Sequence, residues 1–134
     1  MLKTFIGRVI SGKGQGERFV DLPWVKEECK RLLGFTPYPG TLNLLISHEE
    51  KAFLLRLAKE QGVILKPPEG SPYCKALLLR ASVEGFSGAL VFPEDIVWEY
   101  RDKDVVEFVA PVKLRKELGL SDNCMCRLEI VDAT

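Results

Sequence analysis

Glycine and proline interrupt this chain so often that it can build only short elements. Its 134 residues contain 11 glycines and 8 prolines, spread along the whole length. Glycine breaks regular structure through its backbone freedom, and proline through its missing N–H. Between these breaks the sequence predicts strands at residues 3–10, 41–46, 63–66, 73–83, 104–110 and 124–131, another from the tight connection at 85–88 through 92, and a short extended piece at Phe19 and Val20.

Helices are predicted from capping signals at their starts and from glycines after their ends. Asp21 is the expected cap of the first helix, and Ser47 with Glu50 forms the capping-box pattern of the second. The predicted helices cover residues 21–33, 47–61 and 111–118. Many short strands with a few short helices predict a mainly β, α+β fold that is closed or nearly closed into a β-barrel.

The charge balance and the absence of long apolar segments exclude several classes of partner. Lys and Arg number 19, and Asp and Glu also number 19. Proteins that bind nucleic-acid backbones usually carry a basic excess, and a membrane span needs a long apolar run that this sequence lacks. We expect one cytoplasmic domain over residues 1–134, with free cysteine thiols and with no nucleic-acid, membrane or obligate protein partner.

A glycine loop, Gly12-Lys13-Gly14-Gln15-Gly16, directly follows the first predicted strand. Glycines let backbone amides approach an anion closely. Gly7, Gly12 and Lys13 have the spacing of a P-loop, but Gly14 stands where a P-loop has Ser or Thr, and the dinucleotide spacing is also missing. Two interpretations remain open at this point, namely an anion-binding loop and a hairpin tip with a solvated Lys13.

A stiff turn at residues 37–40, Pro-Tyr-Pro-Gly, precedes the second predicted strand. On that strand Thr41 and Asn43 point to one face, while Leu42 and Leu44 point to the other and into the core. A hydroxyl and an amide oxygen are neutral, hard ligands that suit a magnesium ion bound together with substrate phosphates. The alternative is a polar pair on a solvated strand face.

Three blocks of the sequence resemble the archaeal CTP-dependent riboflavin kinase family. They are Gly-Lys-Gly-Gln-Gly at 12–16, Leu-Gly-Phe-Thr-Pro-Tyr-Pro-Gly-Thr-Leu-Asn-Leu at 33–44, and Val-Val-Glu-Phe-Val-Ala-Pro-Val-Lys-Leu-Arg at 105–115. The resemblance runs nearly end to end. It implies a six-stranded cradle-loop β-barrel related to riboflavin-synthase-like barrels, without the winged-helix domain that some members carry. It also implies magnesium-dependent transfer of the γ-phosphoryl of CTP to the ribityl 5′-hydroxyl of riboflavin, giving FMN and CDP.

The same resemblance implies site residues, position by position. Glu107 is implied as a flavin contact and is the candidate to accept the hydroxyl proton. The family's threonine eight residues earlier is replaced here by Glu99, which leaves the flavin contact at that position open. Relatives tend to show Asp-Gly-Asp where this chain has residues 122–124. The implied nucleotide-binding residues are Gly12, Lys13, Gly14, Gln15, Gly16, Glu17, Val112, Lys113, Leu114 and Arg115, and the implied magnesium ligands are Thr41 and Asn43.

Two functions of other classes stay open from the sequence alone. The chain could be a barrel that binds a nucleotide or flavin without chemistry, as a sensor. It could also bind oligonucleotides by stacking bases on Trp98 and Tyr100, although the neutral net charge argues against that. The preference for CTP over ATP follows only from the resemblance, because no base-reading residue is recognisable in the sequence.

Overall fold

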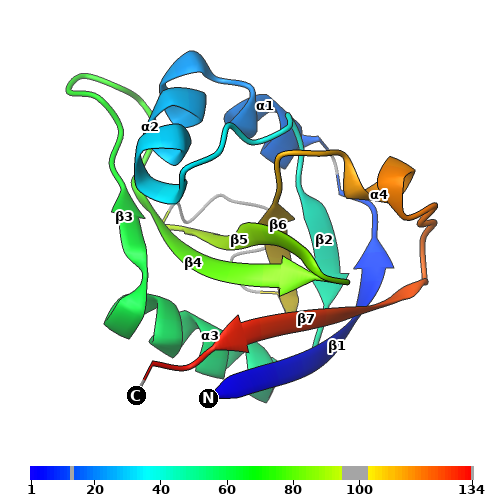
Figure 1. The fold of residues 1–134 in the computed structure, drawn as a ribbon. Helices are drawn as coiled ribbons and strands as arrows, with labels where there is room; N and C mark the ends of the chain where they lie inside the picture. Colours follow the sequence, from blue (N-terminus) through cyan, green and yellow to red (C-terminus); the bar gives the residue numbers. More distant parts are fainter. Residues whose placement is uncertain (13, 95–102, 134) are drawn as a thin grey trace.

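The computed structural model of this protein describes residues 1–12, 14–94 and 103–133 (Figure 1). Its strands pair in an antiparallel sheet. Within these residues seven strands pair in the order β3-β4-β5-β6-β2-β1-β7. In addition, β7 pairs with β4 through Ser82↔Glu129 and Val83↔Leu128. The strands are β1 (Leu2–Ile10), β2 (Leu42–Leu45), β3 (Val63–Leu65), β4 (Ala76–Val83), β5 (Phe86–Pro93), β6 (Val105–Val109) and β7 (Met125–Val131).

Short helices lie on two sides of the sheet. Figure 1 shows α1 and α2 together on one side, and α3 on the opposite side, close to both chain ends. No helix in the described part of the chain is long and apolar enough to cross a membrane. The helices are α1 (Gln15–Val20), α2 (Pro23–Leu33), α3 (His48–Gln61) and α4 (Leu114–Glu117).

Two apolar clusters bury both faces of the central strand β6. Val106 and Phe108 belong to a cluster that includes Leu54 of α3. Val105 and Val109 belong to the other cluster, with residues of α1 and α2. Because successive side chains of a strand alternate between faces, a strand buried on both sides reads as continuously apolar. Any polar side chain in β6 therefore lies in a dry setting.

The capping box of α3 is confirmed in both of its bonds. The Ser47 hydroxyl accepts a hydrogen bond from the Glu50 amide at 3.1 Å, and the Glu50 carboxylate accepts one from the Ser47 amide at 3.0 Å. The end of α2 is also confirmed, since Gly34 ends this helix with a φ of 86°. Glycine adopts this left-handed conformation without steric cost. Local signals therefore determined these two helix ends.

Two local predictions are wrong. Phe19 and Val20 lie in α1 rather than in an extended piece, because a helix buries both against the second apolar cluster. Asp21 does not cap α2; its amide bonds to the Glu17 carbonyl and ends α1, while extended Leu22 stands before Pro23. A residue that precedes proline is disfavoured in the helical region, which separates the two helices there.

Two further boundaries differ from prediction. The short helix α4 begins at Leu114 rather than at residue 111, with extended Lys113 as its N-cap. The tight connection between β4 and β5 is Glu84-Gly85, with φ of 47° and 83°, so that β5 already begins at Phe86. Two positive φ values in a two-residue loop match the natural twist of a hairpin. The predicted loop at 85–88 was therefore placed too far along the chain.

All four cysteines are free thiols. Cys29 is buried on α2, and burial raises its pKa to about 11. Cys126 is buried on β7, and burial raises its pKa as well. Both side chains pack as small apolar groups, which is how buried cysteines usually behave.

Candidate active site

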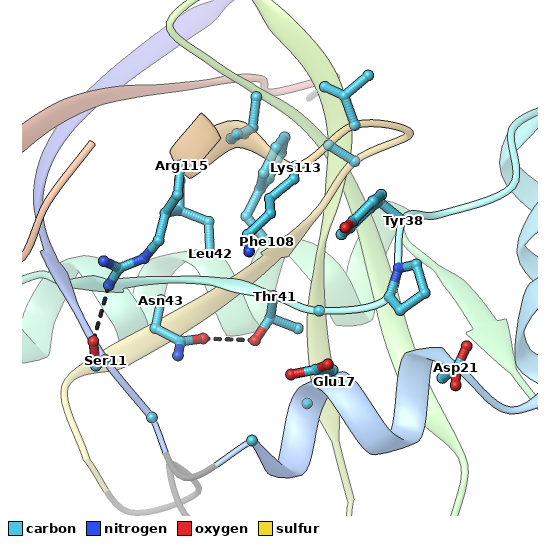
Figure 2. Close-up of a pocket in the computed structure, with 18 of the residues that line it drawn as sticks. Ser11, Glu17, Asp21, Tyr38, Thr41, Leu42, Asn43, Phe108, Lys113 and Arg115 are labelled. Carbon is cyan, nitrogen blue, oxygen red and sulfur yellow. Dashed lines mark hydrogen bonds between the residues drawn. The ribbon is translucent and has the colours of Figure 1, made fainter. Parts of the chain in front are cut away.

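A cavity of about 520 Å³ opens where four segments of the chain meet (Figure 2). These segments are the end of β1 with the glycine loop, helix α1, the turn that leads into β2, and the connection from β6 to α4. The volume lies in the range of sites for small molecules. Its lining includes ten residues that the sequence assigned to a site: Gly12, Gly14, Gly16, Glu17, Thr41, Asn43, Val112, Lys113, Leu114 and Arg115.

The remaining predicted site residues do not line this cavity or are not described. Gln15 opens α1 and Glu107 lies within β6, and neither belongs to the lining. Lys13 and Glu99 fall outside the described residues. The two aromatic residues considered as stacking platforms, Trp98 and Tyr100, fall outside them too.

Thr41 and Asn43 lie side by side on one face of the chain. The Thr41 hydroxyl donates a hydrogen bond of 2.7 Å to the Asn43 side-chain oxygen, which Figure 2 shows at the wall of the cavity. Leu42 and Leu44, at 6% and 0% exposure, point to the other face and into the core. The alternation predicted from the sequence is therefore confirmed. Thr41 and Asn43 line a cavity instead of an open strand face, and the buried Leu42 also borders this cavity.

Helix α1 approaches this pair closely because its second residue is a glycine. A Cβ atom at Gly16 would lie 2.6 Å from the Thr41 hydroxyl oxygen, a distance that real Cβ contacts essentially never show. Gly14, at the N-cap, has a left-handed φ of 81°, which glycine adopts freely. These two glycines bring α1, and with it the carboxylate of Glu17, to the cavity wall below Thr41 (Figure 2).

The paired oxygens fit two neighbouring positions of a magnesium ion. They lie 2.7 Å apart. Adjacent oxygens of an octahedral magnesium site, with ligands at 2.0–2.1 Å, lie about 2.9 Å from each other. The described residues contain no group of three or more His, Cys, Asp or Glu side chains that could hold a metal ion. A hydroxyl and an amide oxygen are neutral, hard donors of the kind that magnesium accepts.

Two cationic side chains stand on the wall of the cavity above the Thr41–Asn43 pair. Figure 2 shows Lys113 with its ammonium group directed toward that pair. The Arg115 Nη2 group donates to the Ile10 carbonyl at 3.1 Å, to the Ser11 hydroxyl at 3.2 Å and to Asp122 at 2.6 Å. Hydrogen bonds from Arg115 and Ser11 hold the pKa of the Asp122 carboxyl below its usual range. Positive charge at this wall favours an anionic ligand.

Glu107 lies on the same side of the sheet as Asn43. Its side chain is 3% exposed, between Val105 and Val109 on β6. Asn43 and Glu107 are directly paired across β2 and β6, and directly opposed residues of an antiparallel pair share a face. No buried side-chain nitrogen or oxygen in the described residues lacks a hydrogen-bond partner. At 3% exposure, the Glu107 carboxylate lies in a dry setting.

The sequence missed several lining residues. Tyr38 lies at the cavity and is held there because its amide donates a hydrogen bond of 2.8 Å to the Ala110 carbonyl. Its position within the proline-rich block was the available signal. Asp21 was interpreted as a helix cap, but its carboxylate lines the cavity and pairs with Lys26 at 2.8 Å.

Comparison with known families shows to which family this chain belongs. The model of the CTP-dependent riboflavin kinase domain, described as a domain of unknown function (DUF120), matches residues 9–130. The chain belongs to the CTP-dependent riboflavin kinase family. The resemblance inferred from three sequence blocks is therefore confirmed, and all three blocks fall inside the matched region.

Curated relatives in this family come from several archaea. The riboflavin kinase of Archaeoglobus fulgidus is 35% identical over 127 residues, which cover 93% of this chain and 53% of the relative. The riboflavin kinase of Pyrobaculum arsenaticum is 37% identical over 128 residues, covering 94% and 60%. The riboflavin kinase of Methanococcus aeolicus is 34% identical over 142 residues, covering 97% and 100%. The chain thus spans about half the length of the first relative and the whole length of the third.

Proposed function

We propose that this chain is a riboflavin kinase that transfers the γ-phosphoryl of CTP to the ribityl 5′-hydroxyl of riboflavin, forming FMN and CDP. The observation that carries the proposal is the convergence, on one cavity, of ten residues from the three sequence segments that the family resemblance assigned to the site. Membership of the family and the riboflavin kinases among its relatives support the chemistry. The choice of CTP as donor is supported by the family model.

We further propose that the fold is a six-stranded cradle-loop β-barrel. Its support is the order of strand pairings, which runs β4-β5-β6-β2-β1-β7 and then returns to β4. In this arrangement β3 pairs with β4 outside the ring. The proposed barrel is a single domain over residues 1–134, working in the cytoplasm. Its cavity lies beside the ends of β1 and β6, where the nucleotide-binding segments meet.

The nucleotide is proposed to lie between the glycine loop and α4. Amides of the loop that begins at Gly12 offer hydrogen-bond donors to phosphate oxygens. Lys113 and Arg115 line the same cavity and supply positive charge. Lys13, which lies outside the described residues, stays a prediction. Transfer of a phosphoryl group depends mostly on positioning and on charge stabilisation, and these groups provide both.

Thr41 and Asn43 are the residues that would hold magnesium. Two neutral oxygens bind the ion weakly by themselves, so metal and nucleotide are expected to bind together. When bound, the ion would neutralise the charge of the transferring phosphoryl group. The close approach of α1 through Gly16 fixes the Thr41 side chain from the other side.

Glu107 is the proposed acceptor of the riboflavin hydroxyl proton. It stands directly across from Asn43, so base and metal ligand share one side of the sheet. Burying a carboxylate beside valines is unfavourable unless hydrogen bonds compensate for it, and such a group is often retained because it has a function. The flavin contact at Glu99 lies outside the described residues and stays a prediction.

The test is a direct assay with every nucleoside triphosphate. The protein is incubated with riboflavin and magnesium, with CTP, ATP, GTP or UTP in turn, and FMN is separated chromatographically. We expect rapid FMN formation with CTP and slow formation with the others. Equal rates with ATP would overturn the donor assignment. Binding of riboflavin or CTP without any FMN would instead favour the non-catalytic sensor.

A further inference from the structure

Three side chains meet at the edge of the cavity, one from the N-terminal part of the chain and two from its C-terminal part. Asp122 accepts hydrogen bonds from the Ser11 hydroxyl at 2.8 Å and from Arg115 Nη2 at 2.6 Å. Ser11 directly precedes the glycine loop, Arg115 lies in α4, and Asp122 precedes β7. Both Ser11 and Arg115 line the cavity. This cluster therefore joins the two segments that are proposed to hold the nucleotide.

The backbone around Asp122 is fixed to β1. The Asn123 amide donates to the Val9 carbonyl at 2.8 Å, and the Val9 amide donates to the Cys124 carbonyl at 2.8 Å. Asn123 also has a left-handed φ of 74°, which Asn tolerates better than most residues. The carboxylate of Asp122 thus extends from a backbone that is anchored to β1 through the two residues that follow it.

Asp122 holds Arg115 by one edge of its guanidinium group. The three described bonds of this group all involve Nη2. The side chain is 31% exposed and lines the cavity, where Figure 2 shows it next to Ser11. A guanidinium carries five N–H donors in a rigid plane, so the Nε and Nη1 groups stay available while Nη2 is held.

We propose that Asp122 is a positioning residue for the nucleotide, acting by orienting Arg115 toward the phosphates. The proposal rests on the proposed function, because CTP is the ligand whose phosphates Arg115 meets. An ion pair this exposed contributes little to folding stability. A guanidinium that is already oriented loses less freedom when it binds an anion, which strengthens binding. The main effect of Asp122 is therefore on nucleotide affinity and not on the fold.

The test compares Asp122→Ala with the wild-type chain in CTP binding and in catalysis. We expect the Kd for CTP, measured by calorimetry, to rise about tenfold, as for a lost hydrogen bond to a charged group. The KM for CTP should rise to a similar extent, while kcat at saturating CTP and the KM for riboflavin stay near the wild-type values. Asp122→Asn, which keeps an oxygen acceptor at the same position, should recover part of the lost affinity.

A matched control is available on α2. Glu28 accepts two hydrogen bonds of 2.8 Å from Arg31, and this pair does not line the cavity. Glu28→Ala removes a comparable carboxylate–arginine pair and should leave CTP affinity unchanged. A similar loss of affinity in both variants would show a general effect of surface charge and would overturn the proposal.

A double variant separates positioning from simple stabilisation. Arg115→Ala should weaken CTP binding, and adding Asp122→Ala should cause no further loss, because the carboxylate acts through the arginine. Additive losses, or an Asp122→Ala variant that melts earlier but binds CTP normally, would overturn the inference while leaving the kinase function intact. A wild-type chain that neither binds CTP nor forms FMN would overturn the proposed function, and this inference with it.

Discussion

Helices α1 and α3 are held in place in opposite ways. Helix α3 has 14 residues, a complete capping box and a buried face that contains Leu54 and Leu57. Helix α1 has six residues, begins at left-handed Gly14 without a side-chain cap, and packs on Thr41 through Gly16. Local signals thus define α3, whereas α1 is defined by burial against the second apolar cluster and by its close contact with Thr41. The difference separates a part of the chain that stabilises the fold from a part that shapes the cavity.

The largest expected effect is on stability and concerns helix α3. Leu54 is fully buried in the first core cluster, so Leu54→Ala leaves a cavity in the core. We expect the free energy of unfolding to fall by about 2–5 kcal/mol, measured by urea denaturation. FMN formation per folded molecule should stay close to that of the wild type. Leu2→Ala, at a residue 59% exposed, is the matched control and should change little. A loss of activity in molecules that remain folded would show that α3 also supports the site.

The second prediction concerns the cavity side. Thr41→Val keeps the shape of the side chain but removes the hydroxyl that bonds Asn43. If Thr41 is a magnesium ligand, the rate of FMN formation should fall about 100-fold or more. Stability should fall by only about 1 kcal/mol, the value of one hydrogen bond.

Thr4→Val is the control for this change. Thr4 is exposed on β1, so its hydroxyl has no role in the cavity. The control should keep the wild-type rate. Magnesium-dependent CTP binding should weaken in Thr41→Val alone. A Thr41→Val protein with normal turnover and a lower melting temperature would show that the pair is structural.

The smallest expected effect concerns the N-terminal cap of α3, which α1 lacks. Ser47→Ala removes the hydroxyl that accepts from the Glu50 amide at 3.1 Å. Loss of such a cap lowers the free energy of unfolding by about 1 kcal/mol. Ser87→Ala, at an exposed position of β5, serves as the control. The rate of FMN formation should not change, and an altered rate would contradict the separation of the two regions.

The predictions that succeeded came from residues whose neighbours in sequence decide their conformation. Ser47 and Glu50 are three apart, so their side chains can close a capping box without help from the rest of the chain. The alternation of Thr41 and Asn43 against Leu42 and Leu44 follows from strand geometry alone.

The predictions that failed concern segments where packing decides between alternatives. Phe19 and Val20 fit a strand or a helix equally well in sequence, and the helix was selected by burial against the second apolar cluster. Aspartate is a residue type that often caps helices, which is why Asp21 was predicted as the cap. However, α2 begins at Pro23, so its N-cap is Leu22 and not Asp21. Tyr38 was not assigned to the site because the turn alone does not show which side of the molecule it faces.

The sequence by itself determined the family, the mainly β composition of the fold and the two faces of the Thr41–Asn43 segment. These follow from local motifs and from the fixed periods of strands and helices. Only the tertiary structure decided that the glycine loop, the Thr41–Asn43 pair and Arg115 border one cavity, and that Asp122 holds Arg115 there. The physical reason is that strand pairing joins residues such as Ile10, Asn43 and Glu107, whose distance along the chain does not reveal their distance in space.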